Sequence, residues 1–269
     1  MSDVVLTSVE DAVMVITMNR PESLNAMTPE MLDTLADVAA KAAADPAIRC
    51  VVITGAGRAF CAGGDVKAMA AANEAAASSG GGGGLVSRVD VLRQQEEVSR
   101  LLHEMPKPTI AAVNGVAAGA GLSVALAADL RIASDQARFT TAFAKVGFSG
   151  DFGGTWLLQR LVGPMRAREL YFLSDVLDAA RALELGIVSR VVPHDQFWAE
   201  TMALAKRLAS GPTLAYARMK DNFVYGETNT FADTLTREAE NMIASGQTED
   251  HRNAARAFVE KREPVFHGR

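Results

Sequence analysis

Two short β-branched runs, each followed by small residues, constrain the fold of this chain more than any other feature. The first is "CVVITG", which ends at Gly55, and the second is "TIAAV", which leads into Asn114 and Gly115. Apolar runs of this length are typical of buried strands. They recur with glycine turns and helical segments between them, and this alternation predicts an α/β fold whose sheets are covered by helices.

The flanking segments divide the chain into two parts. Near the start, "VVLTSVEDAVMVITMN" predicts two strands around a polar turn, and Thr28 with Pro29 predicts the beginning of a helix. After about residue 195 the strand signals stop, and four helical segments follow. We therefore expect a core over residues 1–195 and a C-terminal helical region over residues 196–269.

Residues 70–90 contain two serines followed by five consecutive glycines, in "AAANEAAASSGGGGGLVSRV". Fixing such a glycine-rich segment in one conformation costs much conformational entropy, so this composition predicts a mobile surface loop. Loops of this kind gate or line sites in some proteins and are tolerated insertions in others. The pattern resumes as one helix in "SRVDVLRQQEEVSRLLHEM".

Composition excludes several classes of function. The net charge of −5 comes with no dense Lys/Arg stripe, which argues against a nucleic-acid partner. No apolar run reaches the ~18–20 residues of a membrane span, and the first residues lack the pattern of a secretory signal. Cys50 and Cys61 have no Cys or His at metal-ligand spacing. We expect a soluble, cytoplasmic protein without a metal and without a membrane association.

Two small-residue turns precede helical segments. Gly63 and Gly64 stand before a helix that begins near Asp65, and Gly119 to Gly121 precede a long apolar helix. The free N–H groups at a helix start favour negative charge, and two such turns can converge into a two-donor oxyanion hole. Neither "GAGRAF" nor "GVAAGAG" completes the dinucleotide-binding fingerprint, which argues against nucleotide-dependent redox chemistry.

At this point the chain resembles the crotonase superfamily, also called the enoyl-CoA hydratase/isomerase family. The resemblance lies in six segments spread along the chain in the family's order: "NRPESLNAM", "AFCAGGDVKAM", "PTIAAVNGVAAGAGLSVALAADLRIAS", "GGTWLLQRLVG", "DAARALELGIVSRVVP" and "AFVEKREPVF". It implies a spiral of ββα units with a C-terminal helical trimerisation region, in a homotrimer or a dimer of trimers. It also implies an acyl-CoA substrate, with CoA as part of the thioester and no separate cofactor, and an enolate held by two backbone N–H groups.

The resemblance also assigns residues. It places the two N–H donors at Gly64 and Ala120. It places CoA near four residues of the core and two of the terminal helix, which would close over it from the same or a neighbouring subunit: Leu24, Ala26, Ala62, Val66, Phe258 and Lys261. For Lys261, a solvated charge on a helix is the alternative interpretation.

The sequence departs from the family's hydratases at both catalytic glutamates. The alignment puts Ser123 at the first position and Phe143 at the second. Without paired carboxylates there is no general base to activate water and no matched acid to protonate the α-carbon. Efficient hydration of an enoyl-CoA is therefore not expected.

Asp151, in "KVGFSGDFGGTW", instead matches an aspartate of non-hydratase members. Dienoyl-CoA isomerases, ring-epoxide/oxepin-forming phenylacetyl-CoA isomerases and chlorobenzoyl-CoA dehalogenases resemble this pattern, and the phenylacetyl-pathway isomerases look most similar. A partly desolvated carboxylate has a raised pKa, which suits a base that takes and returns a proton. We therefore expect a double-bond or ring isomerase with Asp151 as its acid/base.

Three alternatives remain. Asp151 can be a turn cap, because Gly-Asp-Phe-Gly is turn chemistry. The protein can be a hydratase with an atypical site in which Asp151 positions water, or a non-catalytic acyl-CoA-binding protein. Asp65 is expected to cap the helix that it opens, and Cys61 to be a small buried residue.

Overall fold

The computed structural model describes residues 4–66, 68, 74 and 85–269, and it confirms the α/β fold. The larger of two sheets has the strand order β1-β2-β3-β5-β7-β10, in which β1 and β2 are antiparallel and the remaining neighbours are parallel. Its strands are β1 Val5–Glu10, β2 Val13–Met18, β3 Cys50–Gly55, β5 Thr109–Val113, β7 Leu130–Ser134 and β10 Arg190–Val192.

The smaller sheet has the order β4-β6-β8-β9, and its first three strands are parallel. These strands are β4 Ala59–Cys61, β6 Val116–Ala118, β8 Arg138–Thr140 and β9 Leu177–Asp178. Three times the chain passes from a strand of the larger sheet to one of the smaller sheet, in β3–β4, β5–β6 and β7–β8. Because β4, β6 and β8 run parallel, the turns that follow them leave the same edge of the smaller sheet.

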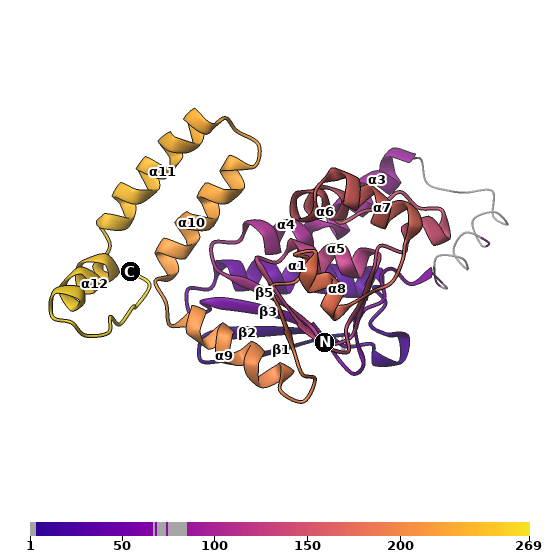
Figure 1. Ribbon diagram of the computed structural model, residues 1–269, viewed down its shortest axis with the longest axis horizontal. Coiled ribbons are helices and arrows are strands. Elements are labelled where there is room, and N and C mark those ends of the chain that lie inside the picture. Colours follow the sequence, from indigo (N-terminus) through magenta and orange to yellow (C-terminus); the bar gives the residue numbers. More distant parts are fainter. Residues whose placement is uncertain (1–3, 67, 69–73, 75–84) are drawn as a thin grey trace.

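Helices cover both faces of the larger sheet (Figure 1). The body contains α1 Pro29–Ala44, α3 Leu85–Gln95, α4 Glu97–Glu104, α5 Ala120–Ala127, α6 Gly154–Val162, α7 Pro164–Leu173, α8 Ala179–Glu184 and α9 Phe197–Ala209, with 3-10 turns at Pro21–Ser23 and Phe143–Val146. The expected cap of α1 is confirmed, since the Thr28 hydroxyl accepts from the Met31 N–H at 3.3 Å.

Two expectations need correction around residues 70–105. Most of the predicted loop lies outside the described residues, but the chain is helical from Leu85 onward. The single helix expected over residues 87–105 is two helices, because Glu96 interrupts it between α3 and α4.

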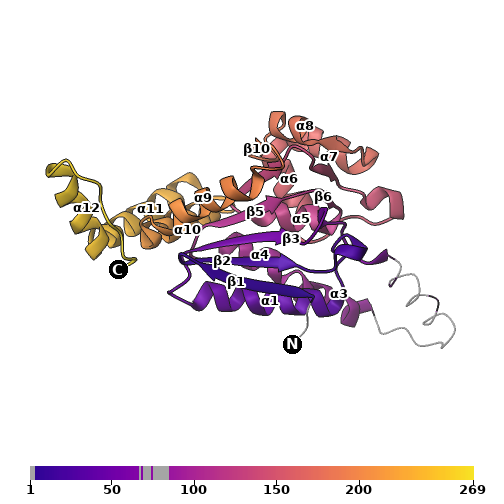
Figure 2. The ribbon, with the colours of Figure 1, turned by 90° about the horizontal axis from the view of Figure 1, so that it is seen from below.

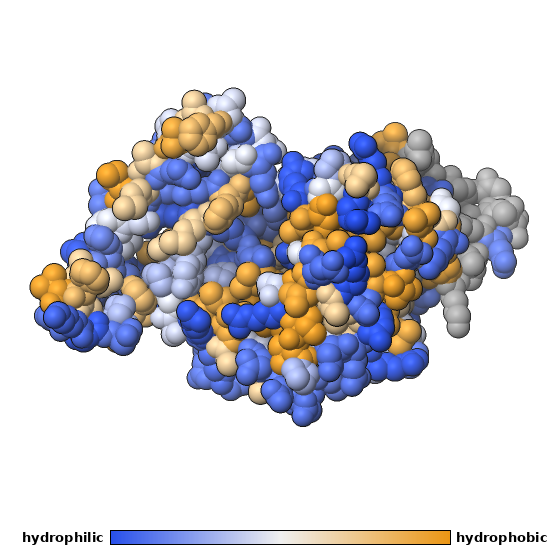
Figure 3. Space-filling view, viewed as in Figure 1, coloured by the Kyte–Doolittle hydropathy of each residue, from blue (hydrophilic) through white to orange (hydrophobic). Residues whose placement is uncertain are grey.

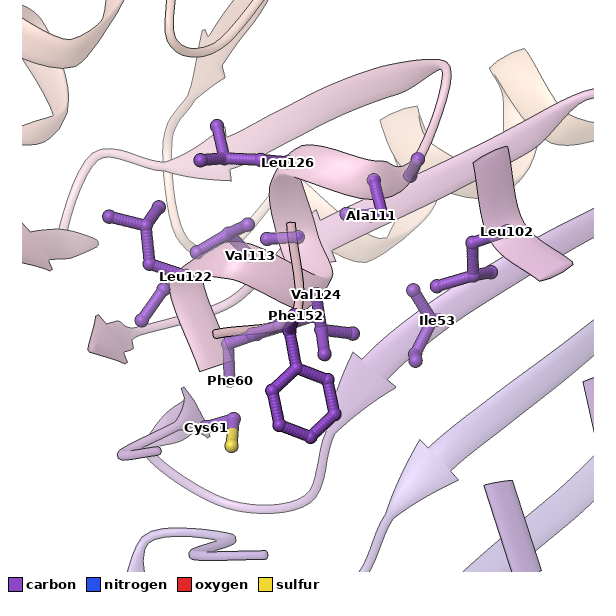
Figure 4. Close-up of a cluster of buried hydrophobic side chains, with 14 of the residues drawn as sticks. Ile53, Phe60, Cys61, Leu102, Ala111, Val113, Leu122, Val124, Leu126 and Phe152 are labelled. Atoms are coloured by element: carbon purple, nitrogen blue, oxygen red, sulfur yellow. The ribbon is translucent and has the colours of Figure 1, made fainter. Parts of the chain in front are cut away.

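The core forms on both faces of the larger sheet, because successive strand residues point to opposite sides. Val51 and Ile53 of β3 join the cluster under α1, α4 and α5, whereas Cys50 and Val52 join the cluster under α9. Figure 4 shows side chains of β3, β5 and α5 packed together with Phe152. All six residues of β3 are buried, as expected of a strand covered on both faces.

The last three helices extend away from the body (Figures 1 and 2). They are α10 Thr213–Gly226, α11 Phe231–Gly246 and α12 Glu249–Val259, whereas α9 packs against the larger sheet. Figure 3 shows the surface hollowed between these helices and the body, where a cavity of about 480 Å³ lies between α6 and α10. None of the described helices is long and apolar enough to cross a membrane.

The beginning of α5 lies against β4 with no space for a side chain at Gly121. A methyl group there would overlap the Cys61 carbonyl oxygen and lie 2.8 Å from Cys61 Sγ. Gly246, near the end of α11, has open space around the same position.

We predict that Gly121→Ala lowers the melting temperature, although alanine is the better helix former. Helix propensity favours alanine by about 0.8–1 kcal/mol, but overpacking against a fixed backbone costs about 1–3 kcal/mol. Gly246→Ala is the matched control and should leave the melting temperature unchanged or slightly higher. Equal stabilisation by both substitutions, measured by calorimetry, would contradict this contact.

Candidate active site

The turns that follow β4 and β6 meet the segment that precedes α6. They contain Gly64, Ala120 and Asp151, and they line one cavity of about 250 Å³. The described residues of its wall are mostly glycine, alanine and larger apolar side chains: Ala62, Gly63, Gly64, Val66, Leu92, Gly119, Ala120, Ala142, Phe143, Val146, Phe148, Ser149, Gly150 and Asp151. The structure therefore brings together the three residues predicted to be catalytic, although they are up to 87 positions apart in the sequence.

Glycine allows the first two turns to approach each other closely. A Cβ at Gly63 would lie 2.9 Å from the Ala118 carbonyl oxygen and 3.6 Å from the Ala120 nitrogen. Gly63 has φ of 98° and Gly119 has φ of 53°, backbone conformations that side chains disfavour. These glycines let the two turns lie in contact.

The turn after β4 is held by the segment that precedes α1, in a pattern that leaves one N–H group free. Ala62 N donates to Leu24 O at 2.9 Å, Met27 N donates to Gly63 O at 2.8 Å, and Asp65 N donates to Met27 O at 3.2 Å. The N–H of Gly64, between these bonds, has no acceptor among the described residues. The same holds for the N–H of Ala120, which is the first residue of α5 and has no partner within the helix.

The supporting residues are structural. The Asn25 amide donates to Ala59 O at 2.8 Å and so joins the segment before α1 to β4. Asp65 accepts from the Ala68 N–H at 3.1 Å and pairs with Arg20 at 3.1 Å. The prediction that Asp65 caps a helix is confirmed.

Asp151 presents a buried carboxylate oxygen to this region. Its Oδ1 is buried and has no hydrogen-bond partner among the described residues, so this oxygen caps no turn formed by them. Burial raises the pKa of Asp151 to about 6, and the negative charge of Glu96 adds to the rise. Its neighbours Gly150, Phe152 and Gly153 all have positive φ, so the backbone around the carboxylate is held in left-handed conformations.

Glu96 is a site residue that the sequence did not indicate. It stands at the break between α3 and α4, and its Oε1 accepts from the Phe152 N–H at 3.0 Å. It lines a neighbouring cavity with Phe152 rather than the cavity of Asp151. Nothing in the helical pattern of residues 87–105 could mark this glutamate, because its partner is 56 positions away.

The two positions compared with hydratase glutamates differ in their surroundings. Phe143 lines the cavity with an apolar ring. Ser123 is only 1% exposed and faces Gly154 and Tyr171 behind the cavity wall. Cys61 is fully buried, and burial raises the pKa of its thiol to about 12, so it stays protonated at neutral pH.

The residues predicted to contact CoA fall into three groups. Ala62 and Val66 line the cavity. Leu24 and Ala26 lie in the adjoining segment that bonds to residues 62–65. Phe258 lies in α12 and Lys261 just after it; Figure 1 shows α12 on the side of the molecule opposite α3 and α5, which contain the cavity residues Leu92 and Ala120, and Phe258 is 85% exposed. Among the described residues, no cluster of three or more His, Cys, Asp or Glu could hold a metal ion.

Comparison with known proteins gives one consistent result. The family model for enoyl-CoA hydratase/isomerase matches residues 8–269. The 1,2-epoxyphenylacetyl-CoA isomerase of Escherichia coli is 39% identical over the full length of both chains. The short-chain-enoyl-CoA hydratase of Clostridium acetobutylicum is 34% identical over 96% of this chain and 95% of its own. A crystal structure of an enoyl-CoA hydratase from a Polaromonas species, 30% identical, superposes with a TM-score of 0.90 over 98% of this chain and 99% of its own.

The negative charge of Glu96 gives a pH prediction. Glu96→Gln keeps an oxygen that accepts from Phe152 but removes the charge, so the pKa of Asp151 should fall. It should stay above the ordinary value, because burial is the larger cause. Carboxyl ¹³C NMR titration measures it directly. Glu97→Gln, which removes a partner of Arg100, is the control and should leave the Asp151 pKa unchanged.

The raised pKa of Asp151 also predicts a pH-dependent stability. Because the folded pKa lies above the ordinary value of 3.8, ionisation of Asp151 disfavours the folded state at pH 8. Asp151→Asn should therefore raise the melting temperature by a few degrees at pH 8. The gain should disappear as the pH falls through about 6 to below 3.8, where the wild-type carboxyl is neutral in both states. A lower melting temperature for the variant at pH 8 would contradict an unpaired buried carboxylate.

Proposed function

The chain belongs to the enoyl-CoA hydratase/isomerase family, and we propose that it acts in this family as an isomerase that moves a proton along the acyl chain or ring of a CoA thioester. Its crotonase-type α/β fold with a C-terminal helical region is that of the solved relatives. The observation that carries the proposal is the position of Asp151, which lines the same cavity as Gly64 and Ala120; its Oδ1 and their N–H groups have no hydrogen-bond partner among the described residues.

In the proposed reaction, the thioester carbonyl oxygen accepts hydrogen bonds from the N–H groups of Gly64 and Ala120. Both groups lack an acceptor among the described residues, and their turns are in contact at Gly63. When the carbon next to the carbonyl loses a proton, negative charge moves onto this oxygen and both bonds strengthen. Loss of one such donor typically costs about 2.7–4 kcal/mol of transition-state stabilisation.

Asp151 supplies the proton transfer. With a pKa of about 6 its carboxylate is mostly ionised at neutral pH, yet close enough to that pH to hold the proton between the two steps. It removes a proton from carbon, which leaves the electron pair in the enolate. It then returns the proton to another carbon of the same conjugated system, and the double bond shifts without any net gain or loss of atoms.

Hydration is the second candidate, because a relative with this fold is a hydratase and Glu96 places a second carboxylate near Asp151. Two observations favour isomerisation. Asp151 is the only carboxylate among the described residues of the cavity wall, where Phe143 adds an apolar ring. Glu96 accepts a backbone hydrogen bond and lines a different cavity.

The proposal includes the CoA site and the assembly. CoA would extend along Leu24, Ala26, Ala62 and Val66, and the distant position of α12 favours a neighbouring subunit as the source of Phe258 and Lys261. A homotrimer or dimer of trimers would also cover the apolar side chains that the projecting helices expose, which include Phe223, Phe231, Met242, Ile243, Phe258 and Val259.

Solvent exchange tests the proposed chemistry. The protein is incubated in D₂O with a panel of enoyl- and phenylacetyl-type CoA thioesters, and mass spectrometry follows the substrate and product. We expect deuterium uptake without added water mass, reduced about 10²- to 10⁴-fold in Asp151→Asn. Asp37→Asn, an exposed change on α1, should keep full activity.

The other outcomes decide between the alternatives. A gain of water mass would replace isomerisation by hydration. Binding of the thioesters with neither deuterium nor water uptake would indicate an acyl-CoA-binding protein. Full exchange in Asp151→Asn would exclude Asp151 as the proton carrier.

A further inference from the structure

Tyr171, on α7, packs behind the segment that carries Asp151. A Cβ at Gly150 would lie 2.9 Å from Tyr171 Cε1, and a Cβ at Gly154 would overlap the Tyr171 hydroxyl. The tyrosine therefore touches the backbone on both sides of Asp151, where glycine alone leaves it room.

The same tyrosine is connected to the turn that carries Ala120. Its hydroxyl and the Ser123 hydroxyl converge on the Cβ position of Gly154, and Ser123 is the polar neighbour that partly offsets the rise in the pKa of the phenol. Ser123 Oγ in turn donates to the Gly119 carbonyl oxygen at 3.4 Å. Gly119 directly precedes Ala120, so a short polar chain runs from the Asp151 segment to the N–H donor.

The tyrosine ring adds a second, apolar connection. It stacks on Phe143 with the ring centroids 5.8 Å apart and the planes at 6°. Phe143 lines the cavity, and its ring lies 3.9 Å from the Cβ position of Gly119. Tyr171 thus contacts the Asp151 segment and stacks on Phe143 of the cavity wall. Its hydroxyl also lies beside that of Ser123, which donates to the Gly119 carbonyl oxygen.

We propose that Tyr171 is a positioning residue which, through Ser123, fixes the Asp151 carboxylate relative to the Ala120 N–H. The proposal rests on the proton transfer proposed above, because that reaction needs both groups at one substrate. Tyr171 does not line the cavity and is not itself a proton carrier. Burial raises the pKa of its phenol to about 12, so the phenol stays protonated at neutral pH.

Such a residue should have a large effect on the reaction rate although it does not line the cavity. A displacement of about 1 Å of a catalytic group can cost about 10²-fold in rate. The Asp151 segment contains several residues with positive φ, and Asp151 Oδ1 has no hydrogen bond of its own among the described residues. The position of the carboxylate therefore depends on what packs behind its backbone.

A double-mutant cycle tests the proposal. Tyr171→Phe keeps the ring and its stacking but removes the hydroxyl, and Ser123→Ala removes the other half of the pair. The turnover number is measured for Tyr171→Phe, Ser123→Ala and the double variant with the thioester that the wild type isomerises. Tyr216→Phe is the matched control, because its hydroxyl also packs against a glycine, Gly211, outside the Asp151 cavity.

We expect each single variant to lose about tenfold in kcat and the double variant to lose no more, since both changes break one connection. KM should stay within about twofold of the wild type, and melting temperatures and circular dichroism identify the folded fraction. Tyr216→Phe should keep the wild-type kcat.

Three results would overturn the proposal. They are a wild-type kcat in Tyr171→Phe, losses that multiply in the double variant, and a loss explained entirely by a smaller folded fraction. Asp151→Asn separates this inference from the proposed function. If Asp151→Asn loses exchange while Tyr171→Phe does not, only the positioning role fails. If Asp151→Asn retains exchange, both proposals fail.

Discussion

The close contact between the turn after β4 and the start of α5 positions the rest of the candidate site. At Gly63 and Gly121, the turn after β4 and the start of α5 approach so closely that a side chain would meet backbone atoms. The contact holds the free N–H groups of Gly64 and Ala120 in one cavity wall. An unsatisfied buried donor, such as the N–H of the buried Ala120, costs about 1–3 kcal/mol, so the arrangement needs a rigid support. The fully buried strand β3 and helix α5 provide it.

The carboxylate side of the cavity also contains a polar atom without a partner among the described residues, here an acceptor rather than a donor. Asp151 has a buried oxygen without a partner among the described residues, a raised pKa and neighbours whose backbone adopts left-handed conformations. Each feature costs stability, and each is maintained by neighbours that do not reach the cavity, notably Glu96 and Tyr171. Two N–H groups and one carboxylate oxygen that have no hydrogen-bond partner among the described residues therefore belong to residues that line one cavity with mostly apolar walls.

The fold alone does not select the reaction, because relatives with the same architecture are isomerases and hydratases. In the proposed function, a few side chains around one cavity select the reaction. Phe143 contributes an apolar ring to the wall, and the Ser123 hydroxyl turns toward Tyr171 rather than toward the cavity. Glu96 is close enough to raise the pKa of Asp151, yet its Oε1 accepts the Phe152 N–H.

The sequence by itself determined the local features: the strands ending at Gly55 and before Asn114, the α1 cap at Thr28, the four C-terminal helices and the two small-residue turns. These features depend on backbone preference, capping and hydrophobic period, which neighbouring residues encode. Only the tertiary structure decided the break at Glu96, the pairing of Ser123 with Tyr171 and the surroundings of Asp151. Those contacts join residues about 50 positions apart, and they arise from how packed layers meet, for which no local pattern exists.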